Sequence, residues 1–359
     1  MGTKETLRKT LGIAPVLIWG PPGVGKSAMV TALGKELGLP VEVVLASIRE
    51  PSYFSGLPVV TEEGVRFEPP AWAKRLAKAG KGILFLDDIF AAPPAVQAAL
   101  LRVVLDRVVG EIELPPSVHI VAAAIPPELV AGGWDLSPPL ANQFVHLEYK
   151  VNVDEWVRDF PTYWGNPPDI DLEPEVWARA RAMVAGFIKA RPHLLLQVPR
   201  EDRARGLAWP SPRSWDHASR ALAAFSLDLE AALPFVQGAV GEGAGYEFYT
   251  WAREMDLPDP EEVLQNPSGF RVPERGDLLF ALLSSVVAAV TSRPTEARWE
   301  AAWEALARAA AQAPDIVAAT ASPLVDLART QKFGLPQHPP EAMRILGPIL
   351  KAAENKRRA

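Results

Sequence analysis

The sequence predicts an α/β fold in its N-terminal part, in which helices sandwich a parallel β-sheet, followed by an all-α region. Residues 1–150 alternate short apolar runs with segments of helical periodicity, the pattern of parallel strands joined by crossover helices. From Pro174 onward nearly every segment has helical periodicity, interrupted by Pro and Gly. A glycine-rich motif at residues 20–27 directly follows the first apolar run. This position is typical of a strand–loop–helix unit.

The strands and hairpins follow in chain order. Five short apolar runs are the candidates for the parallel sheet: Val16–Trp19, Val41–Leu45, Ile83–Leu86, Val118–Ala123 and Phe144–Leu147. A helix from Ser27 to Leu37 follows the glycine-rich motif. The insert Ser52–Gly80 is expected to contain a hairpin and a helix, over Leu57–Val60, Gly64–Phe67 and Ala71–Ala79. Beyond the third strand we predict an amphipathic helix over Ala95–Leu105 and a β-rich excursion over Arg107–Leu114.

The second half of the chain is predicted to be helical. The candidate helices are Glu175–Ala190, Pro212–Ser226, Leu229–Val240, Gly243–Met255, Asp277–Val290, Thr295–Ala311, Asp315–Leu327 and Pro340–Glu354. Residues 151–172 are rich in Trp, Pro and Asn, and we interpret them as a connector. No internal repeat of fixed period is present.

Composition excludes several classes of protein. The net charge is −6 with both signs interspersed, which argues against bulk attraction to nucleic acid or to an anionic membrane. The absence of Cys excludes disulfides, thiol catalysis and cysteine metal sites. The beginning of the chain has no apolar signal core, and the run Leu278–Val290 is too short to span a bilayer. We therefore expect a cytoplasmic protein without a membrane partner.

The glycine-rich motif is Gly20-Pro21-Pro22-Gly23-Val24-Gly25-Lys26-Ser27, which fits G-x-x-x-x-G-K-[ST]. Glycines let the backbone curl so that successive N–H groups point at phosphate oxygens, and the helix that follows aims its positive end at the same place. Lys26 is expected to reach the outer phosphates, and the Ser27 hydroxyl to ligate Mg²⁺. The motif and Ala28 after it therefore predict binding of a nucleoside triphosphate.

A second motif, Ile83-Leu84-Phe85-Leu86-Asp87-Asp88, is an apolar strand that ends in two carboxylates. Residues at the carboxyl end of a parallel strand point into the crevice where ligands bind. Asp87 is expected to hold the Mg²⁺ shell beside Ser27. Asp88 lies where many such enzymes have a Glu that orients the attacking water. A simple helix cap is the alternative for such a pair, but the upstream motif favours the metal site.

The order of these motifs resembles the AAA+ superfamily and, more narrowly, its MoxR-like branch. The resembling segments are GPPGVGKS at 20–27, SGLPVV at 55–60, GILFLDDIFAAPPAVQAALLRVVLDRVVGEIELP at 82–115, VAAAIPPE at 121–128, LSPPLANQFVHLEY at 136–149 and SPRSW at 211–215. The resemblance covers residues 12–225 and thins out in the C-terminal helices. It implies four parts: an AAA+ nucleotide-binding domain over 1–150, the connector over 151–172, a helical lid over 173–265 and a C-terminal helical extension over 266–359.

The resemblance also implies an activity and partners. Members of the branch bind ATP or ADP with Mg²⁺, assemble as rings that are usually hexameric, and act as chaperone-like remodelers. They are often paired with a protein that carries a von Willebrand factor A-type domain. Arg213 matches the lid arginine called sensor 2. The residues agree, because Ser211 is a good N-cap and Pro212 suits the first helical turn, which puts Arg213 at a helix start.

Three positions depart from the family pattern, and all three concern hydrolysis. Asp88 replaces the catalytic Glu, Ile125 replaces a polar sensor at the end of the fourth strand, and Gln143 replaces an arginine that reaches into the neighbouring subunit. Such an arginine is worth about 10³–10⁵ in rate. Three other arginines could act on a neighbouring subunit in place of the arginine that is missing at residue 143. They are Arg102, Arg107 and Arg158.

Three functions follow as hypotheses. The first is a slow ATPase that remodels a protein client as a homo-oligomer. The second is a nucleotide-gated scaffold that binds ATP with little or no hydrolysis. The third is a DNA-linked AAA+ loader, which the acidic net charge and the absence of a basic patch with interleaved aromatic residues disfavour.

Overall fold

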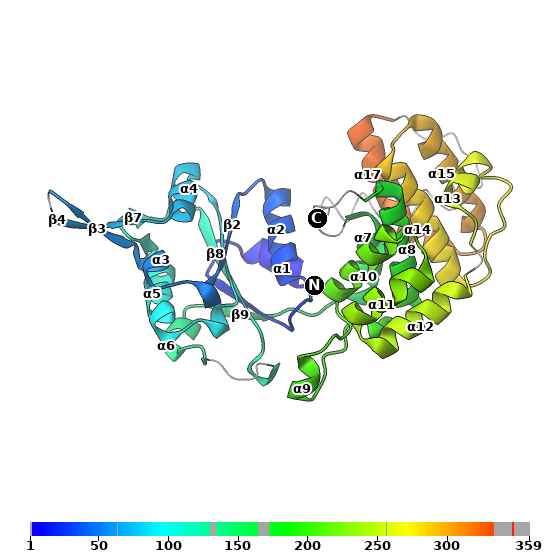
Figure 1. The fold of residues 1–359 in the computed structure, drawn as a ribbon. Coiled ribbons are helices and arrows are strands. Elements are labelled where there is room, and N and C mark those ends of the chain that lie inside the picture. Colours follow the sequence, from blue (N-terminus) through cyan, green and yellow to red (C-terminus); the bar gives the residue numbers. More distant parts are fainter. Residues whose placement is uncertain are drawn as a thin grey trace. The chain divides into compact units, whose positions relative to one another are not determined.

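The computed structural model describes residues 2–62, 64–129, 134–163, 172–255, 257–333 and residue 347. The chain divides into two compact units, Met1–Val151 and Asn152–Ala359. The first unit is an α/β domain and the second is helical, as the colours from blue to cyan and from green to red show in Figure 1.

The first unit is built on a five-stranded parallel sheet with the order β2-β5-β8-β1-β9. Its strands are β1 (Val16–Trp19), β2 (Val41–Leu45), β5 (Gly82–Asp87), β8 (Val118–Ala124) and β9 (Val145–Glu148). The five predicted strands are confirmed, each within one residue at either end. The apolar runs could be recognised because central parallel strands are buried on both faces.

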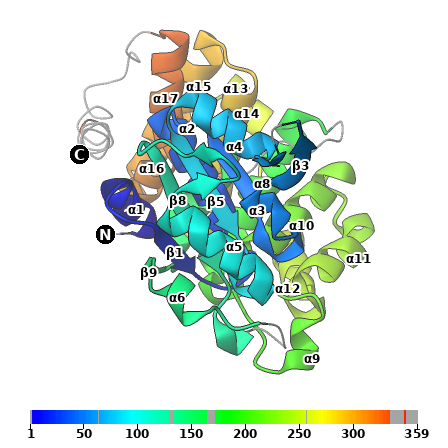
Figure 2. The same ribbon diagram turned by 90° about the vertical axis from the view of Figure 1, so that its left-hand side faces the viewer.

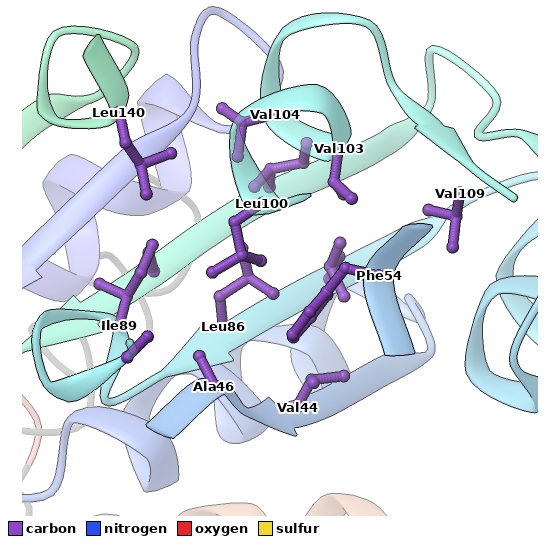
Figure 3. Close-up of a cluster of buried hydrophobic side chains, with 14 of the residues drawn as sticks. Val44, Ala46, Phe54, Leu86, Ile89, Leu100, Val103, Val104, Val109 and Leu140 are labelled. Carbon is purple, nitrogen blue, oxygen red and sulfur yellow. The ribbon is translucent and has the colours of Figure 1, made fainter. Parts of the chain in front are cut away.

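Helices cover both faces of this sheet, with α1 and α2 on one side (Figures 1 and 2). The helices of the first unit are α1 (Thr3–Thr10), α2 (Lys26–Leu37), α3 (Ser52–Ser55), α4 (Ala71–Ala79), α5 (Pro94–Leu105) and α6 (Pro138–Ala141). Side chains alternate along the strands, so that Leu84 and Leu86 pack with α3–α6 while Ile83 and Phe85 pack with α1 and α2. Figure 3 shows the first of these cores, in which Leu86 and Leu100 lie between the sheet and α5.

Two short hairpins extend from the first unit. They are formed by β3 (Leu57–Thr61) with β4 (Gly64–Glu68), and by β6 (Val108–Val109) with β7 (Ile112–Glu113). A Cβ atom on Gly56 would lie 2.7 Å from the Cα of Gly110, so only glycine permits the two hairpins to approach this closely. Glu111 also accepts a hydrogen bond from the backbone N–H of Phe67 at 3.2 Å. The predicted insert and the predicted β-rich excursion are therefore in contact. We call the two hairpins together, β3–β4 and β6–β7, the arm.

The second unit consists of helices packed around a buried central helix, α14. Its helices are α7 (Val153–Tyr163), α8 (Pro174–Ala190), α9 (Asp202–Arg205), α10 (Pro212–Ala224), α11 (Leu229–Val240), α12 (Glu242–Arg253), α13 (Pro260–Gln265), α14 (Gly276–Ser292), α15 (Glu296–Ala310), α16 (Pro314–Thr320) and α17 (Ser322–Gln331). Twelve consecutive residues of α14 are buried, from Leu279 to Val290. Among the described residues, no helix combines the length and apolar character that crossing a bilayer requires.

One helical prediction is wrong in detail, and the segment interpreted as a connector contains a helix that was not predicted. The helix expected over Asp315–Leu327 is two helices, because Pro323 lies in the first turn of α17 and cannot continue the preceding helix. The expected connector contains helix α7, in which Trp156 and Phe160 are buried and stack with ring centroids 4.2 Å apart. The helix predicted over Pro340–Glu354 lies outside the described residues apart from Gly347.

Arg298 joins three helices of the second unit, and replacing it tests this packing. Its guanidinium donates to both carboxylate oxygens of Glu261, at 2.6 and 2.7 Å, and to the carbonyl of Ala289 at 3.0 Å. Because the Arg298 side chain is only 23% exposed, we expect Arg298→Leu to lower the free energy of unfolding by about 1–2 kcal/mol in urea titrations.

Arg293→Leu is the matched control. This arginine bonds Glu175 at 2.9 Å from a side chain that is 68% exposed, so we expect a loss of less than about 0.5 kcal/mol. Equal losses for the two variants would contradict the assigned role of Arg298.

Candidate functional site

The glycine-rich loop joins β1 to α2 at the carboxyl end of the sheet. Gly23 and Gly25 have φ values of 77° and 100°, in the region that favours glycine, and Gly25 caps the first turn of α2. Helix α2 begins at Lys26, one residue before the predicted start. Val24 is buried and anchors the loop, whereas Pro21 and Pro22 are half-buried and Ala28 is exposed. The loop is therefore a turn with a helix N-terminus behind it, which is the geometry of an anion site.

Lys26 is held inside this loop. Its side chain is buried, and its Nζ donates hydrogen bonds to the carbonyls of Gly20 at 2.7 Å and Pro21 at 3.0 Å. These carbonyls come from the start of the loop, so the ammonium group lies across the turn that phosphates would occupy. A buried ammonium group with carbonyl partners keeps its charge at low cost and can exchange those partners for phosphate oxygens.

The side chains of Ser27 and Asp87 are in contact, although the two residues are 60 positions apart in the chain. The Ser27 hydroxyl donates to Asp87 Oδ2 at 2.6 Å, and the other carboxylate oxygen accepts the backbone N–H of Asp88 at 3.0 Å. Hydroxyl and carboxylate oxygens are the hard ligands that Mg²⁺ prefers. This donor set fits a magnesium ion. In the described parts of the chain, this site included, no group of three or more His, Asp or Glu residues is arranged to hold a metal ion.

Asp88 has an unusual backbone. Its φ and ψ are 55° and 41°, in the left-handed region, where Asp and Asn occur more often than other residues that carry a Cβ. It is half-buried and directly precedes the short turn η2 (Ile89–Ala91). A left-handed residue at the end of a buried strand turns the chain away from the sheet, and such strained positions cluster at functional sites.

The remaining predicted residues lie in three places. Ile125 directly follows β8 and is half-buried, and Gln143 precedes β9, where its Nε2 donates to the carbonyl of Pro139 at 3.3 Å. Arg213 lies in the second unit, in the first turn of α10. As predicted, Ser211 caps this helix, and it forms a reciprocal capping box with Ser214.

The three arginines considered as substitutes differ in their partners. Arg102 is exposed on α5, and Arg158 pairs with Asp159 at 2.7 Å. Arg107 is engaged within its own unit, where its guanidinium donates to the carbonyls of Leu114, Pro115 and Val118. Burial lowers the pKa of Arg107, and Glu113 opposes this shift. Arg107 therefore stabilises the turn between α5 and β8, which argues against a role in a neighbouring subunit.

Two residues that the sequence did not mark lie against the site. The Trp19 indole N–H donates to His146 Nδ1 at 3.0 Å, and His146 Nε2 lies 2.9 Å from the carbonyl of Ala141. The Trp19 ring also packs edge-on against Phe90, with centroids 5.9 Å apart. The only sequence signal was an aromatic residue directly before the glycine-rich loop, because the partners of Trp19 are distant in the chain.

The strand order and the two motifs define a domain of the phosphate-loop class. Residues 15–144 match the family model of the AAA domain (dynein-related subfamily). The match covers the sheet from just before β1 to just before β9 and leaves the second unit unassigned.

Known proteins resemble parts of the chain. An uncharacterized AAA domain-containing protein of Schizosaccharomyces pombe is 41% identical over 93 residues, which are 24% of this chain and 11% of that protein. ATPase family gene 2 protein homolog B of Homo sapiens is 35% identical over 109 residues, 28% of this chain and 14% of that protein. The Holliday junction branch migration complex subunit RuvB of Ligilactobacillus salivarius is 27% identical over 151 residues, 39% of each protein.

Among solved structures, a RuvB variant of Thermotoga maritima aligns with a TM-score of 0.38 and 18% identity over 80% of this chain and 79% of that chain. The matches to the three curated relatives span between 11% and 39% of their length.

Proposed function

We propose that this protein is an AAA+ ATPase that binds ATP with Mg²⁺, hydrolyses it slowly, and remodels a protein partner as an oligomeric ring. The contact of Ser27 with Asp87 at 2.6 Å, beside the loop that encloses Lys26, is the observation that carries this proposal. Phosphate-loop ATPases need a hydroxyl and a carboxylate at one metal position, next to a lysine and a helix N-terminus. The AAA family match over the same segment supports it.

Different residues bind the phosphates, hold the metal ion, orient the attacking water and sense the terminal phosphate. The N–H groups from Gly23 to Gly25 and at the start of α2 bind the phosphates, and Lys26 exchanges its carbonyl partners for phosphate oxygens. Ser27 and Asp87 would hold Mg²⁺, which when bound neutralises charge on the phosphates. Asp88 orients the water that attacks the terminal phosphate, and Arg213 senses that phosphate from the helical lid.

Slow hydrolysis follows from three side chains. The Asp88 carboxylate is one methylene shorter than that of Glu, and small misplacements at a reacting centre cost on the order of a hundredfold. Ile125 provides no polar group beyond β8, and Gln143 carries no charge for a neighbouring site. Binding of ATP depends on none of these three positions.

The remodelling role is supported by the arm formed by the two hairpins. Four apolar side chains of its longer hairpin are strongly exposed, with accessible fractions of 59% for Leu57, 83% for Val60, 60% for Val65 and 45% for Phe67. An isolated two-stranded ribbon with such exposure is a typical contact surface for another protein. The MoxR-like resemblance extends this to a hexameric ring in the cytoplasm and to a von Willebrand factor A-domain partner.

A nucleotide-gated scaffold is the second candidate, because Ile125 and Gln143 remove groups that serve hydrolysis and leave the binding loop intact. The deciding experiment measures ATP turnover by the full chain over a range of protein concentrations, and its mass in solution with and without ATP·Mg²⁺. Turnover that rises as the oligomer forms supports the motor. Tight ATP binding and assembly without turnover support the scaffold. Salt-dependent DNA binding would instead favour a DNA-linked loader.

Asp88→Asn tests the catalytic carboxylate with little structural change. Asn has the same shape and tolerates the left-handed backbone of residue 88 at least as well as Asp. We expect wild-type ATP affinity, a free energy of unfolding within about 0.5 kcal/mol of wild type, and turnover at least about tenfold lower. Steady-state phosphate release checks this. Undiminished turnover would remove Asp88 from the mechanism.

The Asp88→Glu variant distinguishes a slow catalytic site from a scaffold that does not hydrolyse ATP. We expect turnover to rise, by up to about a hundredfold, because the added methylene restores the reach of the carboxylate. Unchanged turnover would mean that the length of this side chain does not limit the rate.

A further inference from the structure

Trp19 stands at a junction of the segments that carry the nucleotide site. It is the last residue of β1, and its carbonyl accepts the N–H of Tyr149 at 2.7 Å. Gly20 follows directly, and its carbonyl holds Lys26 Nζ. A displacement of the Trp19 backbone therefore moves Gly20, the next residue, and with it the carbonyl that accepts the Lys26 hydrogen bond.

The Trp19 side chain contacts two further segments. Its ring packs edge-on against Phe90, at an interplanar angle of 70°, and Phe90 lies two residues after Asp88. On another side its indole N–H donates to His146 Nδ1 at 3.0 Å. One indole thus links the phosphate loop, the turn after β5 and strand β9.

The hydrogen bonds define the tautomer of His146. An indole N–H is a donor only, so Nδ1 must be the acceptor and the neutral ring carries its proton on Nε2. That proton is donated to the carbonyl of Ala141 at 2.9 Å. Ala141 is the last residue of α6, two residues before Gln143. The ring therefore connects Trp19 to the α6 turn.

We propose that Trp19 and His146 are a positioning pair that couples the α6 turn to the phosphate loop. This inference rests on the proposed function, in which Gln143 faces a subunit boundary. A neighbouring subunit that shifts the α6 turn moves the Ala141 carbonyl, and the imidazole and indole transmit the shift to Gly20. The contact with Phe90 carries the same shift toward Asp88. Assembly and nucleotide affinity are then linked through two side chains.

The test is a double-mutant cycle on the full chain, with ATP·Mg²⁺ affinity as the measured quantity. Trp19→Phe keeps an aromatic ring against Phe90 and removes the N–H, and His146→Phe removes the acceptor. At about pH 8 we expect each change to weaken binding by about three- to tenfold, and the double variant to be no weaker than the worse single one. Trp251→Phe is the matched control, because it removes an indole hydrogen bond of 2.8 Å to Asp277 in the second unit.

The dependence of ATP affinity on protein concentration provides the readout that a merely structural role would not move. Because the pair responds to a neighbouring subunit, wild-type affinity should change as the oligomer forms, and the affinity of Trp19→Phe should change less. Thermal melting without nucleotide checks folding, and His146→Ala replaces His146→Phe if the latter does not fold.

The outcomes separate this inference from the function on which it rests. Additive losses, or an effect of oligomer formation on ATP affinity that Trp19→Phe leaves unchanged, overturn the positioning pair while ATP binding stands. Absence of ATP binding by the wild-type chain overturns both.

Discussion

Replacing Lys26 by alanine is expected to lower the affinity for ATP by about two orders of magnitude, equivalent to about 2.7 kcal/mol. The ammonium group is buried in the glycine-rich loop and is the charge that the loop presents to phosphates. Its loss removes a charge-assisted hydrogen bond in a site of low dielectric constant, where such bonds are strongest. Titration with ATP·Mg²⁺ by calorimetry measures the effect.

Lys35→Ala is the matched control for this variant. Lys35 is an exposed residue of the same helix α2, so its removal changes the net charge equally without touching the loop. We expect its ATP affinity to remain within about twofold of wild type. If Lys26→Ala bound ATP as tightly as Lys35→Ala, the glycine-rich loop would not be the phosphate site.

Asp87→Asn is expected to abolish the dependence of ATP binding on Mg²⁺. Asparagine keeps the shape of the side chain, and its carbonyl oxygen can still accept the hydrogen bond from Ser27. The negative charge that a magnesium ion requires is lost. ATP affinity in Mg²⁺ should fall at least about tenfold, to the value that wild type shows in a chelator, and turnover should fall with it.

The comparison of four titrations, two proteins each with Mg²⁺ and with chelator, tests this expectation directly. Asp106→Asn, at the exposed C-cap of α5, removes a carboxylate away from the loop and should retain the Mg²⁺ effect. Retention of the effect by Asp87→Asn would instead move the metal away from the end of β5.

Much of the first unit could be predicted because its signals are local. Each central strand is a continuous apolar run, and the glycine-rich motif carries its own strand, loop and helix. The contact of Ser27 with Asp87 was expected because the carboxyl ends of all strands of a parallel sheet lie at one edge, and only β8 separates β1 from β5. The spacing of the two motifs in the sequence does not predict the distance between the two side chains.

What could not be predicted depends on contacts between distant residues. Trp19 and His146 are paired across most of the first unit, and no pattern in the sequence relates them. The sequence leaves Arg107 as a candidate for a role in another subunit, whereas its three carbonyl partners engage it within its own unit. The left-handed backbone of Asp88 is equally invisible, since Asp adopts ordinary conformations far more often.

Two further features of the helical unit have local signals in the sequence. Pro323 marks the break between α16 and α17, and Trp156, Val157 and Phe160 form an apolar stripe at helical spacing within the connector. The Trp, Pro and Asn content of that segment obscured its periodicity. Composition was therefore a poorer guide there than spacing.

The strand order has a consequence for biosynthesis. β1 is an inner strand, and Val16 pairs with Val121 on one side and Val145 on the other. At about 5–20 residues per second, the ribosome needs about 6–26 s after making β1 to supply both neighbours. Until then the apolar run before the glycine-rich loop has no partner and is accessible to chaperones. The phosphate-binding turn is thus synthesised early in its unit, but the strands that flank β1 are synthesised near the end of that unit.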